Sequence, residues 1–302
     1  MRRIASAKKF ATVKRFAFHC LAALAPVAAW AGPYAPAPGN QNPGGIETES
    51  TAIAFDDPRF VGWATGVSGF VRGYLDKAQP EMGKVTYGYN MGSPDDPAHP
   101  PTAGLGQADA GDDSLPVVSL GDAGSMTLTF AQPITNGPGF DFAVFENGIN
   151  EDTSGRGFLE LAFVEVSSDG ITFTRFPSIS LTPTNTQVGS FGTLDPTDLR
   201  NLAGKYERGY GTPFDLAELA GAPSLDITRI THVRVVDVVG TISPTYGTLD
   251  SAGHLINDPY PTRFEQGGFD LDAVGVLHQV PEPSSAWLLA FGVGACIGRR
   301  RG

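Results

Sequence analysis

Residues 159–176 read LELAFVEVSSDGITFTRF, and this stretch decides the fold class. Two segments rich in apolar and β-branched residues, 159–167 and 171–176, flank the triplet Ser168-Asp169-Gly170. An Asp-Gly turn between two such segments is a strong signal for a β-hairpin. The stretch therefore predicts two antiparallel strands joined by a tight turn.

Similar segments lie on both sides of this hairpin. Residues 125–130 alternate Ser and Thr with Met126, Leu128 and Phe130, the period-two pattern of a half-buried strand. Further strands are expected at 117–120, 140–145, 230–239 and 269–278, short helical segments at 56–64, 195–204 and 213–220, and long surface loops over 66–115. Many short strands between Gly, Pro and Asn turns predict an all-β fold, an antiparallel β-sandwich with long loops and few short helices, over residues 51–279.

The first 31 residues have the pattern of a secretory signal peptide. Residues 1–15 carry six basic residues and no acidic one, and an apolar run follows over 16–30. Ala29-Trp30-Ala31 is a small-x-small cleavage site, so cleavage is expected after Ala31. Residues 32–50, rich in Pro, Gly and Asn, are expected to be a flexible lead-in.

Residues 280–302 combine three features in a fixed order. Pro281-Glu282-Pro283 disfavours helix and favours an extended, accessible chain. The apolar run 286–298 follows; as a helix it is about 20 Å long, shorter than the ~30 Å hydrocarbon core of a bilayer. Arg299, Arg300 and Arg301 then keep the following end cytoplasmic by the positive-inside bias. This tail is predicted to be a sorting signal that crosses the inner membrane transiently.

The order of these features resembles the PEP-CTERM sorting signal of Gram-negative bacteria. The resemblance implies that a membrane-embedded exosortase recognises the Pro-Glu-Pro tripeptide, removes the tail and releases or attaches the protein outside the cell. It also implies a secreted protein of the cell surface or extracellular matrix, usually in species that produce exopolysaccharide.

The charge of the chain changes once both ends are removed. The sequence holds 32 acidic and 21 basic residues; six basic residues lie in 1–31 and three at 299–301, which leaves 12 and a formal charge of −20. Such a field repels nucleic acid and favours cation binding. The two cysteines, Cys20 and Cys296, both lie in the removable segments, so the secreted part is expected to fold without disulfides.

The body of the chain also resembles a recurring bacterial cell-surface domain. The resemblance rests on VVSLGDAGSMTLTF, GFDFAVFENG, FLELAFVEVSSDGITFTRFP, LAGKYERGYGTPFDLAEL, ITHVRVVDVVG and GGFDLDAVGVL, and spans about residues 50–278. The order of the VEVSSDGITF, VRVVDV and DLDAV segments is similar to galactose-binding-like (discoidin-type) jelly rolls. This resemblance implies an extracellular, jelly-roll-like sandwich of a group whose members often bind glycans.

Carboxylates supply candidate metal ligands. Asp270 and Asp272 are two residues apart on an expected strand, so both are predicted to point to one face, with Asp237 beside them if its strand is a neighbour. A second group is Asp141, Glu146 and Asn147. Oxygen ligands of this kind suit a structural Ca²⁺, although none of the groups matches an EF-hand loop. The alternative is that these carboxylates are solvated or cap turns.

Aromatic residues in expected loops supply candidate ligand-binding residues, namely Trp63, Tyr87, Tyr206 and Tyr210. Their rings would stack on sugar faces, or would only anchor the loops. No nucleophile elbow or metalloprotease motif is present in the sequence, and the histidines outside the signal peptide are far apart, so no catalytic residue is assigned.

The sequence therefore predicts a secreted, exosortase-sorted surface or matrix protein that binds extracellular polysaccharide and is not an enzyme. Two alternatives remain open at this point. The first is a structural surface protein without a specific ligand, and the second is a glycan-active hydrolase that uses a carboxylate pair.

Overall fold

The computed structural model describes residues 32–39, 49–86, 101–109, 116–150 and 155–282. All of these residues belong to one compact unit, 31–302. The signal peptide, Tyr87, the apolar run 286–298 and the three arginines lie outside the described residues. Within the described ranges, no helix has the length and apolar character needed to span a membrane.

The described residues form mostly short strands. The strands are β1 (Ile53–Ala54), β2 (Gly62–Val71), β3 (Val118–Ser119), β4 (Ser125–Ile134), β5 (Phe142–Glu146), β6 (Ile149–Asn150), β7 (Gly157–Phe158), β8 (Ala162–Ser167), β9 (Thr174–Arg175), β10 (Ile179–Ser180), β11 (Leu199–Arg200), β12 (Tyr210–Phe214), β13 (Ile230–Asp237) and β14 (Asp270–Val276). Four 3₁₀ helices accompany them: η1 (Pro80–Met82), η2 (Pro101–Gly104), η3 (Pro196–Asp198) and η4 (Leu216–Leu219). The predicted all-β, antiparallel fold class is confirmed.

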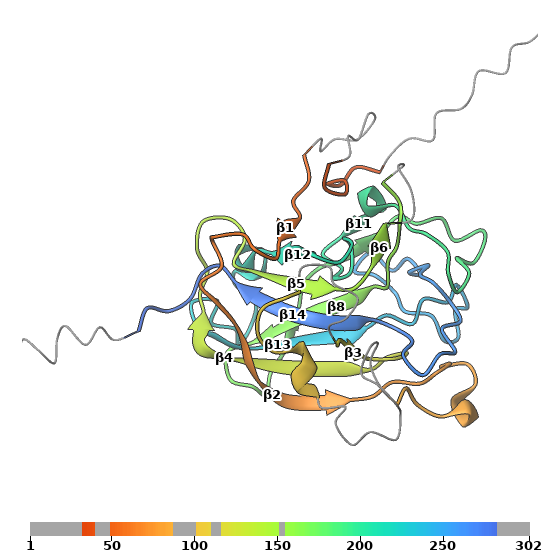
Figure 1. The fold of residues 1–302 in the computed structure, drawn as a ribbon, viewed down its shortest axis with the longest axis horizontal. Coiled ribbons are helices and arrows are strands. Elements are labelled where there is room, and N and C mark those ends of the chain that lie inside the picture. The colour runs from red at the N-terminus through yellow and green to blue at the C-terminus, as the bar shows by residue number, and fades with distance from the viewer. Residues whose placement is uncertain (1–31, 40–48, 87–100, 110–115, 151–154, 283–302) are drawn as a thin grey trace, which may run out of the picture. The chain divides into compact units, whose positions relative to one another are not determined.

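Ten strands form one sheet in the order β1-β12-β5-β14-β2-β4-β13-β8-β9, with β3 on the free edge of β14 (Figure 1). Strand β2 joins the two halves of this sheet. Its first residues pair with β14, where Trp63 lies opposite Gly275, and the rest pairs with β4 up to Val71 opposite Ser125. The sheet therefore curls over at β2, so that its two halves face each other as in a sandwich.

The curl depends on two irregularities in β2. The register with β4 shifts between Ala64 and Gly66 and again between Val67 and Gly69. Bulges of this kind bend a strand and increase its twist. At Gly66 a Cβ would lie 2.6 Å from Thr129 Oγ1, so a larger residue there would force the Thr129 side chain to move.

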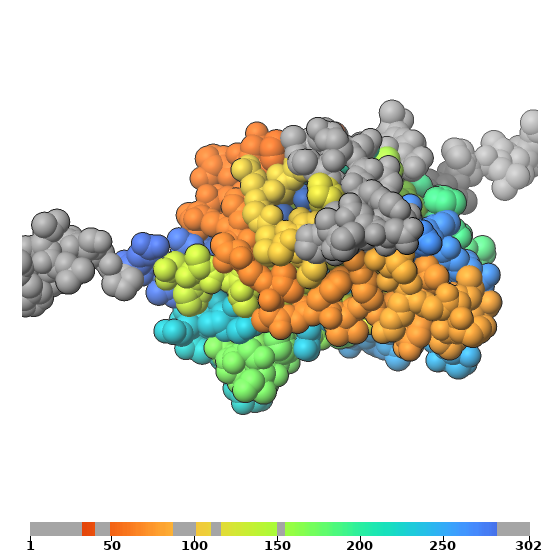
Figure 2. Space-filling view, turned by 60° about the horizontal axis from the view of Figure 1, so that its bottom comes forward, coloured from red at the N-terminus to blue at the C-terminus, as the bar shows by residue number. Residues whose placement is uncertain are grey.

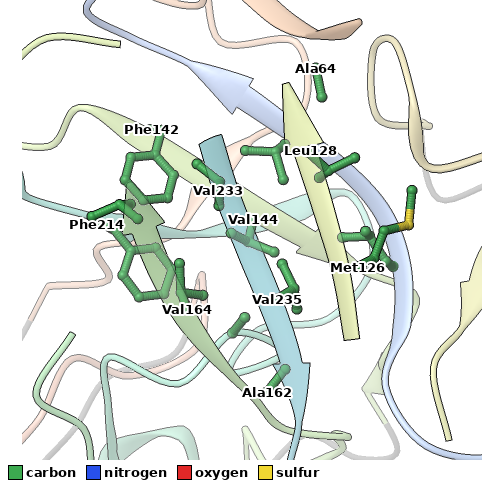
Figure 3. Packing of buried hydrophobic residues seen from close by; sticks show 14 of the residues in the cluster. Ala64, Met126, Leu128, Phe142, Val144, Ala162, Val164, Phe214, Val233 and Val235 are labelled. Atoms are coloured by element: carbon green, nitrogen blue, oxygen red, sulfur yellow. The ribbon is translucent and has the colours of Figure 1, made fainter. Parts of the chain in front are cut away.

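The space between the two halves is filled by the main hydrophobic core (Figure 3). Phe142 and Val144 of β5 lie on one side and Val164, Val233 and Val235 of β8 and β13 on the other. The ring of Phe142 stacks on Phe214 of β12, with centroids 5.3 Å apart. Burial of this apolar surface is the main favourable term that holds the halves together.

Strand β2 and the segment that follows it lie on the outside of the sandwich. Figure 2 shows β2 and the segment after it, drawn in orange, along one face. Helix η2 packs against β2 and β14, and its Ala103 and the adjacent Leu105 contact the main core. The sequence predicted long loops over 66–115 and a helix over 56–64, and both predictions are wrong at β2. Strand β2 consists largely of small and polar residues, and most of its ten residues are half-buried or exposed, so the sequence does not show the pattern of a strand there.

The 159–176 hairpin is confirmed, with a shorter second strand. Asp169 closes the turn, because its Oδ1 accepts from the backbone N–H of Ile171 and Thr172 at 2.8 Å each. These bonds stabilise the charged carboxylate and lower the pKa of Asp169 to about 2. Gly170 follows in the left-handed conformation, with φ of +76°.

Phe142→Ala tests the core assignment. The ring is fully buried against Phe176 and Phe214, so its removal should lower the free energy of unfolding by about 3–5 kcal/mol. Ile171→Ala, at an 85% exposed position, should change it by less than about 0.5 kcal/mol. Chemical denaturation of both variants measures the difference, and equal effects would contradict the packing described.

Candidate functional site

The antiparallel pairing brings the ends of several strands together. Opposite Leu271, near the start of β14, lies Glu146, the last residue of β5. Opposite Ala162, the first residue of β8, lies Asp237, the last residue of β13. Five buried carboxyl groups gather in this region, and we call them the carboxyl cluster: Glu146, Glu160, Asp237, Asp258 and Asp270.

Backbone amides of two segments hold three members of the cluster in place. The successive N–H groups of Gly268 and Phe269 donate to Glu160 Oε1 at 3.1 Å and to Asp237 Oδ1 at 2.7 Å. Next along the chain comes Asp270. The N–H of Leu161, adjacent to Glu160, donates to Asp258 Oδ2 at 2.9 Å. These bonds connect β14, β13 and the segment before β8 through the acids themselves.

The remaining contacts place Glu146 and Asn147 in the same region. Glu146 Oε2 accepts from the N–H of Gly148 at 2.7 Å. The side chains of Ser119 and Asn147 both hydrogen-bond to the carboxyl group of Asp270. The end of β5 and the edge strand β3 therefore both contribute to the surroundings of Asp270.

Burial and mutual repulsion dominate the electrostatics of the cluster. Burial raises the pKa of Asp270 to about 7, despite the bonds from Ser119 and Asn147 and the charge of Arg72. Burial raises the pKa of Glu160 well above its usual range, and the charges of the other four members raise it further. Burial also raises the pKa values of Glu146, Asp237 and Asp258 well above the usual range. The charges of Asp270 and Asp258 add to this for Glu146, whereas for Asp237 and Asp258 the first acid to add to it is Asp122, outside the cluster.

Some buried acids elsewhere in the fold have cationic partners. Asp76, fully buried, forms a 2.7 Å salt bridge with Arg263 and a hydrogen bond with Tyr260, and these bonds lower its pKa although burial opposes them. No member of the carboxyl cluster forms a salt bridge with a described Lys, Arg or His. The repulsion within the cluster is therefore not offset by direct ion pairing within the described chain.

Two oxygens in the cluster have no hydrogen-bond partner in the described part of the chain. They are Glu146 Oε1 and Asp258 Oδ1, on side chains of residues that are 2% and 3% exposed. A buried carboxylate oxygen without a donor is costly and rare in folded proteins. Both oxygens are therefore available to coordinate a ligand such as a metal cation.

The predicted metal ligands divide between different places. Asp270, Asp237, Glu146 and Asn147 do come together, although the strand of Asp237 is not adjacent to β14 in the sheet. Asp272 does not join Asp270, because the register shift between Leu271 and Ala273 breaks the alternation along β14. It accepts instead from the N–H of Asp109. The prediction that both side chains share one site is wrong.

Asp141 lies at the other end of β5. It lies five positions before Glu146, about 17 Å along a strand at ~3.3 Å per residue. It accepts from the N–H of Gly137 and of Leu216, at 2.7 Å each, and contacts His278 Nδ1 at 2.9 Å. Asp141 therefore connects the segments around Gly137, Leu216 and His278. The predicted grouping of Asp141 with Glu146 and Asn147 is wrong. Among the described residues, no three His, Cys, Asp or Glu side chains already stand in a metal-binding arrangement.

A second feature is a pocket of about 190 Å³ beside β12. Its lining combines two aromatic rings, two cations, an acid, an amide and hydroxyl groups: Tyr34, Phe140, Arg200, Lys205, Glu218, Asn201, Thr51 and Thr212. Arg200 Nη2 and Asn201 Nδ2 both donate to Glu218 Oε2, at 3.0 and 2.8 Å. Thr212 Oγ1 is buried and has no hydrogen-bond partner among the residues that the structure describes.

The predicted aromatic platforms take other positions. The Trp63 ring packs between Phe60 and Phe145, with centroids 4.7 and 5.6 Å away, and belongs to a small core on the outer side of the sheet. Tyr206 is 1% exposed and its hydroxyl group bonds Thr51 Oγ1 at 2.8 Å, so a role as a surface platform is wrong. Tyr210 begins β12, half-buried. Trp63 and Tyr210 do not line the pocket.

Sequence reasoning missed Glu160 and Asp258 in the cluster and Tyr34, Arg200 and Asn201 in the pocket. A local signal existed for Glu160, since an acid in the otherwise apolar LELAFV segment is unusual for a buried strand. Tyr34 lies in the segment expected to be a flexible lead-in, yet Gly32 and Tyr34 bond to Thr197. No short-range pattern connects these residues to the sites they form.

A family model described as the PEP-CTERM protein-sorting motif matches residues 279–301. The match confirms the predicted sorting signal, and the matched range contains Pro281, Glu282, Pro283 and the three arginines, whose individual roles stay predictions. No curated protein matches the chain. The resemblance of the body to galactose-binding-like domains stays a prediction.

The raised pKa values predict how stability depends on pH. Burial raises the pKa values of Asp122, Asp270 and Asp272 each to about 7, so between about pH 4 and 7 the folded state binds more protons than the unfolded state. With a chelator present to remove any bound cation, the free energy of unfolding should therefore fall as the pH rises from about 4 to 7. Denaturant titrations at half-unit pH steps measure it, and stability that rises over this range would contradict the assignment.

Proposed function

We propose that this protein is an exported surface protein that holds extracellular polysaccharide in the pocket beside β12. The PEP-CTERM motif supports the first part of this proposal, that the protein is secreted, is processed at a membrane by an exosortase and reaches the cell surface. A Gram-negative host, an extracellular-matrix location and the polysaccharide ligand belong to the proposal.

The single observation that supports a sugar ligand is the composition of the pocket lining. Sugars present apolar C–H faces and many hydroxyl groups, so they are bound by aromatic rings together with planar polar side chains. Tyr34 and Phe140 supply rings, and Arg200, Asn201 and Glu218 form a network of such planar groups at the same place. The hydroxyl group of Thr212, buried and unpaired, is an additional hydrogen-bonding group for a ligand.

The volume also favours a small part of a polymer over a large ligand. About 190 Å³ is below the 300–1,000 Å³ of drug-sized sites, and matches one or two sugar units with the rest of the chain outside. No catalytic residue is assigned to this pocket. Glu218, its one acid, is engaged by Arg200 and Asn201, which suits binding more than proton transfer.

Tyr34→Ala tests the pocket. Loss of one ring contact should weaken binding of the producing strain's exopolysaccharide about tenfold, equivalent to ~1.4 kcal/mol. Tyr246→Ala, which removes a 43% exposed ring outside the pocket, is the matched control and should leave binding unchanged. Affinity electrophoresis with the mature protein measures both. Absence of saturable binding by the parent protein would leave the structural alternative, and release of shorter sugars would favour a hydrolase.

The sorting step has its own test. Pro281→Ala combined with Pro283→Ala relaxes the restricted backbone of the tripeptide, so exosortase recognition should fail. The variant should stay membrane-bound with residues 284–302 attached, which intact-mass analysis of cell fractions detects. Pro223→Ala changes an exposed proline outside the motif and is the control. Normal processing of the double variant would show that the tripeptide is not recognised.

A further inference from the structure

We propose that the carboxyl cluster of Glu146, Glu160, Asp237, Asp258 and Asp270 is a calcium-binding site that joins the strand ends on one side of the sandwich. This site is independent of the polysaccharide pocket. It differs from the metal sites expected from the sequence, because it includes Glu160 and Asp258 and excludes Asp141 and Asp272.

The geometry rests on the chain connections between the five acids. Consecutive amides at 268 and 269 hold Glu160 and Asp237, and Asp270 is the next residue. The amide that follows Glu160 holds Asp258. Pairing of Glu146 with Leu271 brings the fifth acid beside Asp270. Segments distant in sequence are thus held at one place by the residues that would bind the ion.

The unpartnered oxygens point independently to a ligand. Most acids of the cluster use one or both oxygens to accept from backbone amides, which fixes their orientation. Glu146 and Asp258 each use one oxygen in this way, at 2.7 and 2.9 Å, and leave the other buried without a donor. A cation would supply the missing partner for both atoms and would offset the repulsion between all five acids.

The donor set selects calcium among the common cations. All five side chains are carboxylates, and the hydroxyl group of Ser119 and the amide of Asn147 are the polar groups bonded to them. Ca²⁺ takes six to eight oxygen ligands in flexible geometry, whereas Zn²⁺ favours His and Cys, and Mg²⁺ keeps several waters. An exported protein also meets calcium at the concentrations that extracellular sites with Kd of about 10⁻⁴–10⁻³ M require.

Binding includes a movement of side chains. No three described acids already form a metal-binding arrangement, so the ion has to draw oxygens to the 2.3–2.6 Å typical of Ca²⁺. Glu146 and Glu160 have the longest side chains of the cluster, with two rotatable bonds beyond the first, and allow the largest adjustment. Calcium should therefore change the structure locally and raise the stability of the folded state.

The experiment measures calcium binding by the protein purified from the exporting cells, stripped with EDTA and dialysed. Isothermal titration with CaCl₂ at pH 7.5 should show saturable binding. The melting temperature should rise by several degrees in ~2 mM CaCl₂, as expected for a ligand that binds only the folded state. MgCl₂ at equal ionic strength should give a much smaller rise.

Glu146→Gln combined with Asp258→Asn removes the two unpartnered carboxylate oxygens while it preserves side-chain size. This variant should lose the calcium response and keep, or exceed, the parent's melting temperature in EDTA, because repulsion falls. Asp272→Asn is the matched control, since it also removes a buried acid whose pKa is raised to about 7, and it should retain calcium binding.

Three results would overturn the proposal. The first is no saturable binding by the parent protein up to about 5 mM calcium, above the usual range of extracellular sites. The second is an equal response to calcium, magnesium and sodium at matched ionic strength, which indicates general screening. The third is full calcium binding by the double variant. If the double variant fails to fold, Asp237→Asn replaces it, with the same expected loss.

Discussion

Five carboxyl groups buried together, without a direct cationic partner among the described residues, are the constraint on which the rest of this structure depends. Each buried acid disfavours its charged form, and the charge of each neighbour adds to that cost. This unfavourable free energy arises where β5, β8, β13 and β14 end or begin. The same side chains accept the backbone amides of the connecting segments, so they organise the loops while they repel one another. Such an arrangement is stable only when protons or a cation neutralise it.

The curl of the sheet at β2 makes this arrangement possible. Without the two register shifts in β2, the half that contains β14 would continue in the plane of the half that contains β13. Asp237, at the end of β13, would then lie three strands from β14. Because the sheet folds over, the Asp237 carboxyl group reaches the N–H of Phe269 directly. The apolar core that fills the sandwich and the acidic cluster at its end are therefore two consequences of one bend.

Local patterns in the sequence were sufficient for the hairpin at 159–176, for the alternating strand β4 and for the sorting tail, because each of these depends on residues close together in the chain. Strand β2 was not predicted, because its partly exposed glycines, serine and threonine lack an alternating pattern. Four of the six predicted metal-ligand residues do come together. Asp272 was misplaced because a bulge cannot be read from spacing, and Glu160 and Asp258 were missed because only tertiary hydrogen bonds bring them to the cluster.

The charge of the exported part connects the cluster with the compartment. The chain between its two basic ends has a formal charge of −20, so its acids outnumber the cations that could pair with them, and the part between the signal peptide and the sorting tail has no cysteine to form a disulfide. Neutralising its acids with protons requires a pH near the raised pKa values, which a surface protein cannot rely on. Under the calcium proposal, divalent cations outside the cell would neutralise the same groups at constant pH. They would also link strands distant in sequence, much as a disulfide does. A cation-stabilised acidic end therefore fits an exported, cysteine-free sandwich better than an acidic end that depends on protonation.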